Sequence, residues 1–369
     1  MNCCKKYYIK YIVFDFTILM SGNYRGLSKS LKNKEVKMKR LKLGLVVLFV
    51  FFLVLILCSS QVIAGPLQVK WGATSVKSDA YATTVQFAGY VNKLYPDDVN
   101  FTIMETGGFI ENLSRMGKGL LDIAATNPVF ASFAYNGQHN FEGKANTNLR
   151  TIWNTSMRPQ NIVAGKDSGI TKLEDLDGAK MAFNPLSTSE TLSQMFLEAN
   201  GIYPKKINAG TSANLEAMKS RAVDAWIRAG LHTGAIMELA ISRPLNFLAV
   251  TDEHIEKYNE KYPGHGVGIV APAGQYSGQE EEFYSFAFVY GDVVDKDIPE
   301  DIVYKLVKTN WEKRFELTES NAGLRDGGFV EFVDLTLNAT VVPFHPGTVK
   351  FLKELDIDIP DNLIPPELK

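Results

Sequence analysis

The sequence predicts an α/β protein with a largely parallel sheet. Strand-like and helix-like segments alternate along residues 67–355, and the connections between them are short. The part of the chain after residue 64 is long enough for two domains, and chains of roughly 300 residues usually divide in this way. A local pattern that occurs twice supports two similar halves.

The elements are expected in the following order. A helix over 78–95 begins at Ser78 or Asp79, either of which can cap it, and ends before Pro96. An apolar run over 283–290 is expected to return as a strand late in the chain. Other strands are predicted at 67–72, 101–105, 121–126, 162–169, 180–183 and 225–227. Other helices are predicted at 109–119, 173–178, 189–200, 299–318 and 347–355.

The repeated pattern is Asn-Leu-x-x-Met followed by Asp, ten residues after the Asn. It starts at Asn112 and again at Asn214. In both copies an amphipathic helix leads into a strand through the aspartate. The pattern predicts two lobes that contain the same kind of unit, although two ordinary helix–strand units can match by coincidence. We expect residues 65–161 and 283–369 to form the first lobe and residues 162–282 the second. Two chain crossings then create a hinge, with a ligand cleft between the lobes.

The N-terminal region reads as an export signal. The basic cluster Lys39–Lys42 precedes an apolar run over 43–58 and a small-residue site ending at Ala64. The run is shorter than the roughly 18–20 residues that span a bilayer as a helix. Residues 1–64 are therefore expected to be a leader with its export signal, and Met38 the true start. The rest of the chain is expected to work outside the cytoplasm, in the periplasm. An uncleaved membrane anchor is the alternative.

Composition excludes several classes of function. All three cysteines precede residue 65, so the remainder has no disulfide, no thiolate nucleophile and no cysteine metal site. Acidic residues outnumber basic ones after Ala64, which argues against nucleic-acid binding. Neither a nucleophile elbow nor a phosphate loop is present, so an exported enzyme is disfavoured. No metal-ligand spacing joins the histidines, which are His139, His232, His254, His265 and His345.

Four motifs in order resemble those of one family of exported receptors. They are Thr106–Leu113, Lys166–Gly178, Pro272–Gly278 and His345–Gly347. Together they resemble the TAXI-type solute-binding proteins of TRAP transporters. The resemblance implies a two-lobed, periplasmic-binding-protein-like type II fold that closes over one small anion. It also implies no cofactor, no catalysis and a membrane permease as partner. We expect the protein to be a monomer.

The family's usual ligand, glutamate or a related small acid, does not transfer directly to this chain, because the loops that should face the cleft depart from the family pattern. The loop over 184–189 and Gly230-Leu231-His232 both differ from it. We therefore expect a small organic anion, which is a carboxylate or an amino acid such as glutamate. A ligand sensor that docks on a membrane signalling receptor is the rival function.

Three loops that precede helices are candidate anion sites. They contain Thr74-Ser75, Gly107-Gly108 and Ser187-Thr188-Ser189. Ligands of open α/β sheets bind beyond the carboxyl ends of the strands, where free N–H groups and the helix dipole favour an anion. The alternatives are that Ser78 and Ser189 are simple N-caps and that Gly107-Gly108 is a tight turn.

Two arginines are the sharper candidates, because a guanidinium can hold a carboxylate through two parallel hydrogen bonds. Arg228 follows the predicted strand 225–227, and Arg158 lies near the expected hinge. Arg228 could instead pair with Asp224. Polar contacts are also predicted from Asn127 and Asn154, which we expect to follow strands. The pocket wall is assigned to Tyr81, Trp226 and Tyr276, and of these Tyr276 is expected to be exposed to the cleft.

Overall fold

The computed structural model describes Leu45 and residues 65–369, except residues 77, 185–187, 231–232, 263–265 and 326. Residues 65–369 form one compact unit. Apart from Leu45, the predicted leader and export signal lie outside the described residues, as do Ser187 and His232. None of the helices in the described part has both the length and the apolar character that a membrane span needs.

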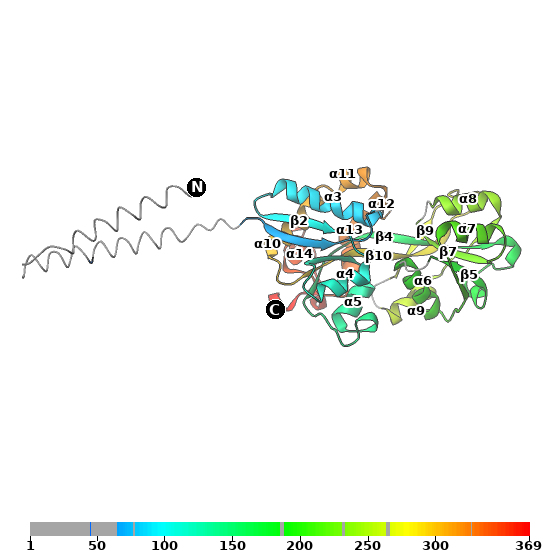
Figure 1. Ribbon diagram of the computed structural model, residues 1–369, viewed down its shortest axis with the longest axis horizontal. Coiled ribbons are helices and arrows are strands. Elements are labelled where there is room, and N and C mark those ends of the chain that lie inside the picture. The colour runs from blue at the N-terminus through cyan, green and yellow to red at the C-terminus, as the bar shows by residue number, and fades with distance from the viewer. Residues whose placement is uncertain are drawn as a thin grey trace, which may run out of the picture. The chain divides into compact units, whose positions relative to one another are not determined.

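Ten strands form the central sheet, which runs through both lobes (Figure 1). The strand order is β2-β1-β3-β10-β4-β7-β5-β6, with β8 paired to β4 and β9 to β10. The strands are β1 (Leu67–Gly72), β2 (Val99–Met104), β3 (Ile123–Thr126), β4 (Leu149–Gly165), β5 (Lys180–Phe183), β6 (Lys205–Asn208), β7 (Ala225–Ala229), β8 (Leu245–Phe247), β9 (Gly266–Ala271) and β10 (Phe283–Asp295).

The long strands β4 and β10 connect the two lobes. The first lobe contains β1, β2 and β3, which are parallel to one another, and the second contains β5, β6 and β7, which are also parallel. Strand β4 pairs with β10 from Leu149 to Pro159 and with β7 from Gln160 to Ala164. Both sets have the strand order 2-1-3. The predicted two-lobed α/β fold of type II is confirmed.

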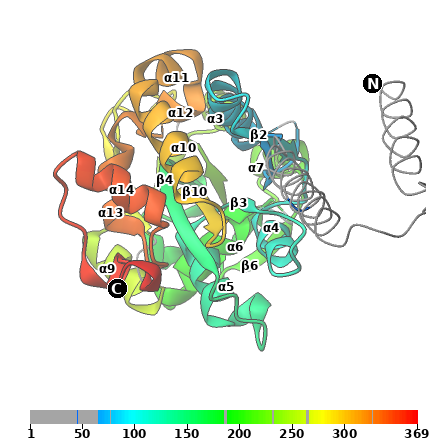
Figure 2. The same ribbon diagram turned by 90° about the vertical axis from the view of Figure 1, so that its left-hand side faces the viewer.

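Helices cover both faces of the sheet, and α10 lies beside α3 and α14 in the first lobe (Figure 2). The described helices are α3 (Asp79–Leu94), α4 (Phe109–Met116), α5 (Pro128–Asn136), α6 (Thr188–Ala199), α7 (Thr211–Lys219), α8 (Gly234–Ser242), α9 (Asp252–Lys261), α10 (Glu300–Glu312), α11 (Arg314–Ser320), α12 (Ala322–Arg325), α13 (Phe332–Ala339) and α14 (Pro346–Glu354).

Some predicted elements have the predicted bounds and others do not, since the helix predicted over 299–318 is two helices, α10 and α11. Strands β1 and β5 match the expected ranges 67–72 and 180–183. The strand predicted over 162–169 is instead the end of β4, which begins at Leu149. Nearly all of β4 is buried, so its sequence lacks the alternation of polar and apolar residues that marks a strand with one exposed face.

The first copy of the repeated pattern ties two strand ends together. Asn112 on α4 is fully buried. Its Nδ2 donates to the carbonyl oxygens of Gly72 (3.1 Å), Ala73 (2.6 Å) and Ala125 (2.8 Å). These carbonyls belong to the carboxyl ends of β1 and β3. One amide therefore fixes the edge of the sheet from which the first-lobe loops leave.

The second copy makes similar contacts in the second lobe, to the ends of β5 and β6. Asn214 on α7 is fully buried, and its Nδ2 donates to the carbonyls of Phe183 (2.9 Å) and Ala209 (2.7 Å). The two aspartates of the pattern also make corresponding hydrogen bonds, each to the backbone N–H of a lysine. Asp122 accepts from the Lys70 N–H at 2.7 Å, and Asp224 accepts from the Lys180 N–H at 3.0 Å. The repeat is thus structural, and each lobe contains one copy of the same unit.

Replacing either asparagine with alanine should therefore lower the free energy of unfolding. We expect a loss of about 2 kcal/mol from Asn112→Ala and a similar loss from Asn214→Ala, because each leaves buried carbonyls without donors. Chemical denaturation measures this. Asn136→Ala is the control, since Asn136 is exposed on α5 and bonds only within its own helix. Equal losses in all three variants would contradict the prediction.

His345 caps α14 in its neutral form. Its Nδ1 accepts from the Gly347 N–H at 3.1 Å, and its Nε2 lies 3.0 Å from the carbonyl oxygen of Ile298 and donates to it. Burial lowers the pKa of His345 to about 4. The unfolded chain therefore takes up this proton at a higher pH than the folded protein does.

The stability that neutral His345 contributes should be complete above about pH 6.5 and lost as the pH falls towards 4. The expected loss is about 3 kcal/mol. Unfolding free energies of wild type and His345→Asn between pH 4 and 7 test this, because asparagine keeps a capping acceptor without titrating. Parallel curves for the two proteins would show that His345 is not responsible.

The first lobe is completed by the last residues of the chain. The guanidinium of Arg150, buried at the start of β4, pairs with both carboxylate oxygens of Glu367. The Nε–Oε2 distance is 3.1 Å and the Nη2–Oε1 distance is 2.5 Å. Segments from both ends of residues 65–369 therefore belong to one lobe.

Candidate functional site

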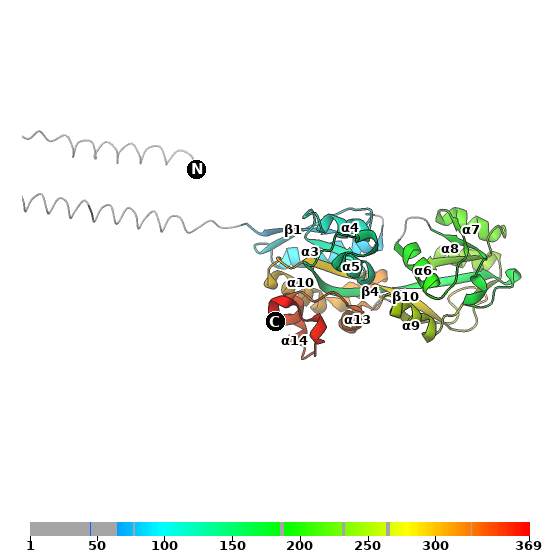
Figure 3. The same cartoon turned by 90° about the horizontal axis from the view of Figure 1, so that it is seen from below.

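The topology makes the carboxyl ends of β3 and β7 face each other. Strand β3 is antiparallel to β10, with Thr126 opposite Gly291, and Gly291 is opposite Asn154 on β4. Strand β7 is antiparallel to β4, with Ala229 opposite Gln160. Six residues of β4 separate these two points, which corresponds to roughly 20 Å of strand. Figure 3 shows β4 and β10 running between the lobes. Loops from both lobes therefore lead into one region beside these strands.

A hollow that is partly open to solvent lies on the first-lobe side of this region. Its walls come from the first turns of α3 and α4, the end of β3, and the middle of β4 and β10. Aromatic rings, hydroxyl groups, one guanidinium and one carboxyl line it. The lining residues are Ala80, Thr83, Thr84, Phe87, Phe109, Ala125, Thr155, Ser156, Arg158, Tyr290, Gly291 and Asp292. This combination suits a small polar molecule with one anionic group.

Arg158 is the cation of the hollow. It is half-buried, and its guanidinium carbon lies 6.0 Å from the ring centre of Tyr290. Tyr290 in turn meets Phe109 edge-on, with ring centres 5.0 Å apart. Arg158 makes one long hydrogen bond, from Nη1 to the carbonyl oxygen of Gly323 at 3.4 Å. Among the described residues no carboxylate forms an ion pair with it.

Asp292 lies in the same hollow and has no cationic partner among the described residues. Its side chain is 5% exposed, and its two oxygens accept from the indole N–H groups of Trp71 (2.9 Å) and Trp153 (2.6 Å). Burial raises the pKa of Asp292 to about 7, although the two indoles oppose this. The carboxyl can therefore be neutral near physiological pH. In that state Arg158 alone sets the charge of the hollow.

Arg228 is the corresponding cation in the second lobe. It lies at the end of β7 and is half-buried, and its buried Nε has no hydrogen-bond partner among the described residues. Burial lowers its pKa. The alternative in which Arg228 pairs with Asp224 is not what the described contacts show, because Asp224 accepts from the Lys180 N–H at 3.0 Å instead. Removing a guanidinium from water is costly unless an anion pairs with it, so a ligand anion would complete this site.

Asn161 is a neighbour of Arg228 that sequence reasoning missed. The two residues are opposite each other on β4 and β7. The Nδ2 of Asn161 donates to the hydroxyl of Tyr276 at 2.9 Å and also to the carbonyl of Gly230. The expectation that Tyr276 is exposed was wrong: it is 4% exposed and stacks on Phe247, with ring centres 5.1 Å apart. The Gly-rich surroundings of Tyr276 suggested a surface loop, but the ring fills the core of the second lobe.

The first predicted loop bonds largely to itself. The hydroxyls of Thr74 and Ser78 share a hydrogen bond, and Ser78 Oγ donates to the Ser75 carbonyl at 2.8 Å. Ser78 also accepts from the Tyr81 N–H at 3.1 Å, so its role as the N-cap of α3 is confirmed. Tyr81 is half-buried in the first turn of α3, beside residues that line the hollow.

The second predicted loop already binds a carboxylate, which comes from the same chain. The Gly107 N–H donates to Oε2 of Glu111 at 2.7 Å, and Oε1 of Glu111 pairs with Arg115 at 2.5 Å. Gly108 has φ +128°, a conformation that favours glycine. The expectation of free N–H groups was therefore wrong at Gly107 and also at Gly108, whose N–H donates to Thr106 Oγ1 at 3.3 Å. The geometry of the loop does suit a carboxylate, as Glu111 demonstrates.

The remaining predicted residues divide between the two lobes. Thr188 begins α6, so Ser189 is its second residue and not its N-cap. Ser189 Oγ donates instead to Gln160 at 2.7 Å. Asn127 follows β3 as expected and caps α5, where its Oδ1 accepts from the Phe130 N–H at 2.9 Å.

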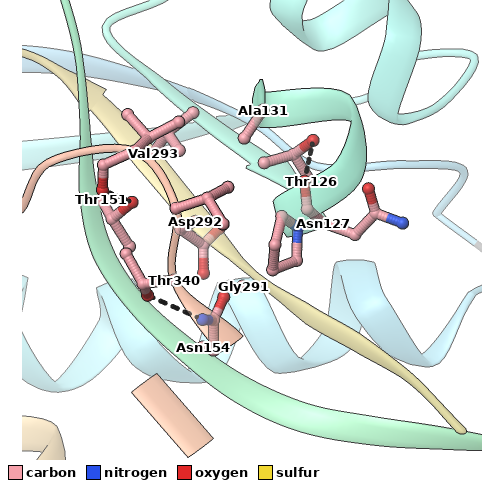
Figure 4. Close-up of a pocket in the computed structure, with 12 residues that line it drawn as sticks. Thr126, Asn127, Ala131, Thr151, Asn154, Gly291, Asp292, Val293 and Thr340 are labelled. Atoms are coloured by element: carbon pink, nitrogen blue, oxygen red, sulfur yellow. Dashed lines mark hydrogen bonds between the residues drawn. The ribbon is translucent and has the colours of Figure 1, made fainter. Parts of the chain in front are cut away.

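Asn154 does not follow a strand, which corrects the prediction, because it lies inside β4. Its Nδ2 donates to Thr340 Oγ1 at 3.0 Å, and its backbone N–H donates to Thr336. Figure 4 shows Asn154 lining a small cavity with Thr126, Asn127 and Thr340. That cavity is next to the hollow, since Gly291 and Asp292 line both. Asn154 thus serves the packing of the first lobe.

A model of the NMT1-like family matches residues 72–355 of the chain. The chain belongs to the NMT1-like family. This NMT1-like chain is also similar to solved structures at low identity. The matches include the periplasmic aliphatic sulphonate binding protein SsuA of Escherichia coli, at 14% identity with a TM-score of 0.43, covering 81% of this chain and 96% of that one.

Two further structures similar to this NMT1-like chain come from other bacteria. One is a putative periplasmic sulfonate-binding protein of Methylobacillus flagellatus, at 11% identity with a TM-score of 0.49, covering 80% of this chain and 97% of that one. The other is the probable amino-acid ABC transporter extracellular-binding protein ytmK of Bacillus subtilis, at 16% identity with a TM-score of 0.41, covering 70% and 98%.

Proposed function

We propose that residues 65–369 bind a small organic anion, a carboxylate or an amino acid such as glutamate, as the two lobes close. One observation carries the proposal: Arg158 lines the hollow beside β4 and β10, Arg228 lies at the carboxyl end of β7, and neither has an acid partner among the described residues. A carboxylate satisfies a guanidinium through paired hydrogen bonds. Closure around such a ligand would bring both cations to one molecule.

The proposed role is transport. The motifs Thr106–Leu113 and Lys166–Gly178 support a TAXI-type receptor that delivers its ligand to a TRAP-type permease in the membrane. We propose that the protein is exported, acts in the periplasm as a monomer, and catalyses no reaction. The site would comprise Arg158, Arg228 and Asn161, with the loop residues Thr74, Ser75, Tyr81, Gly107, Gly108, Asn127, Thr188 and Ser189 around them.

Native mass spectrometry of the protein purified without denaturation tests the binding. We expect one small anion per chain, released by unfolding. Lobe closure is tested with two labels, since residues 65–369 contain no cysteine that would react. Leu120→Cys in the first lobe and Tyr203→Cys in the second are suitable positions, being 55% and 63% exposed. The distance between the labels should shorten when the identified anion is added. A protein that carries no small molecule and binds neither glutamate nor succinate would contradict the proposal.

A further inference from the structure

Strands β4 and β10 separate at one residue. They pair as far as Pro159, opposite Ala287, and from Gln160 onwards β4 pairs with β7. Strand β10 meanwhile pairs with β9 from Phe283 to Phe288. We call this point, at Pro159 and Gln160 of β4 and Ser285 to Ala287 of β10, the fork. Any movement of one lobe relative to the other must pass through it, because β4 and β10 are the strands that both lobes share.

Gln160 connects the fork to α6. The side chain is fully buried. Its Oε1 accepts from Ser189 Oγ at 2.7 Å and from Ser193 Oγ at 3.4 Å, on the first and second turns of α6. Its Nε2 donates to the carbonyl oxygen of Arg158 at 2.8 Å. One glutamine therefore contacts the start of α6, where the second-lobe anion loop ends, and the residue that carries the first-lobe cation.

A second hydrogen bond closes the fork from the other strand. Ser285 on β10 is 1% exposed, and its Oγ donates to the backbone carbonyl of Gln160 at 2.5 Å. This side-chain bond lies just beyond the last backbone pairing of the two strands. It keeps β10 attached to Gln160 beyond the end of the backbone pairing between β4 and β10. A displacement of Gln160 would therefore displace both shared strands.

We infer that Gln160 is a positioning residue that couples the first turn of α6 to the fork. The inference rests on the proposed ligand site at the start of α6. A ligand that binds at the first turn of α6 and moves it would displace Gln160 through its hydrogen bonds to Ser189 and Ser193. Gln160 would transmit the movement to Arg158 and to β10. The hydroxyl groups of the two serines act in this scheme as connections to the hinge, in addition to the ligand contact proposed above for Ser189.

Amide hydrogen exchange tests the coupling without any ligand. In the double variant Ser189→Ala, Ser193→Ala, exchange should become faster by about tenfold in α6 and also over residues 284–287 of β10, because buried polar networks respond as a unit. Gln160→Leu should accelerate the same two segments. The control for the serines is Ser242→Ala, whose hydroxyl bonds to Leu239 at the end of α8 and touches neither segment.

The outcomes separate the inference from the proposed function. Gln279→Leu is the control for the glutamine, since Gln279 is also buried and hydrogen-bonded but does not touch α6. It should leave exchange in α6 unchanged. Acceleration confined to α6 in the serine double variant would overturn the coupling, even if a small anion co-purifies. Acceleration in both segments would support the coupling, even if mass spectrometry finds no anion.

Discussion

Replacing Arg228 with alanine is expected to weaken binding of the co-purified anion by about 2–4 kcal/mol, or roughly 30- to 1,000-fold in Kd. The guanidinium is partly desolvated and its buried Nε lacks a partner among the described residues, so a ligand carboxylate would complete its hydrogen bonds. Titration calorimetry measures the change. Stability should be little affected or improved, since the variant removes a cation that no described acid neutralises.

Two variants control for this result. Arg228→Lys keeps the charge but loses the planar pair of donors, so it should recover only part of the affinity. Lys206→Ala removes a cation from the exposed edge strand β6 of the same lobe and should leave the affinity unchanged. If Arg228→Ala and Lys206→Ala bind the anion equally well, Arg228 does not belong to the site.

Asp292 is expected to make the protein less stable as the pH rises from about 4 to about 7. The folded-state pKa, about 7, is above the ordinary value of 3.8. The protonated form is therefore favoured by folding, and its contribution is complete below the unfolded pKa and lost as the pH passes the folded one. The total expected loss is about 4 kcal/mol. It arises because the ionised carboxylate is buried with two indole donors and no described cation.

The variant Asp292→Asn isolates this contribution. An amide oxygen can accept from only one of Trp71 and Trp153, so the variant should be less stable than wild type at pH 5. That deficit should shrink or reverse by pH 8, where wild type carries the buried charge. Unfolding free energies at both pH values provide the measurement. A deficit that does not change with pH would show that Asp292 is not the titrating group.

The elements that could be predicted are those whose apolar pattern, cap and terminating residue all lie within one short segment of the sequence. Strand β1 and helix α3 were predictable because the apolar pattern, the Ser78 cap and Pro96 all lie within one segment. The repeated asparagine pattern also predicted a real duplication. The extent of β4 was not predictable, because both of its faces are covered by residues distant in sequence. Its polar stretch from Asn154 to Ser156 resembled a loop, yet it is buried within the sheet.

The site was predicted less well than the fold, for the same physical reason. Arg228 was chosen because it follows a predicted strand and Arg158 because it lies near the expected hinge, and both stay predictions. The partner of Gly107 is Glu111, four residues away, and a capping interaction of that kind could have been considered. The partner of Ser189 is Gln160, and that of Asp292 is Trp71, and these contacts depend on packing across the sheet. Residue types and spacing alone do not encode such pairs.

The ion pair between Arg150 and Glu367 constrains the order in which the polypeptide acquires its structure. Glu367 comes after the segment between Gln160 and Ala287 in the sequence, and that segment is continuous, so it is synthesised well before Glu367. Contacts between distant parts of a chain form slowly, because a long loop must be closed first. The second lobe can therefore fold on a nascent chain before Glu367 has been synthesised, whereas the ion pair of the first lobe forms only afterwards.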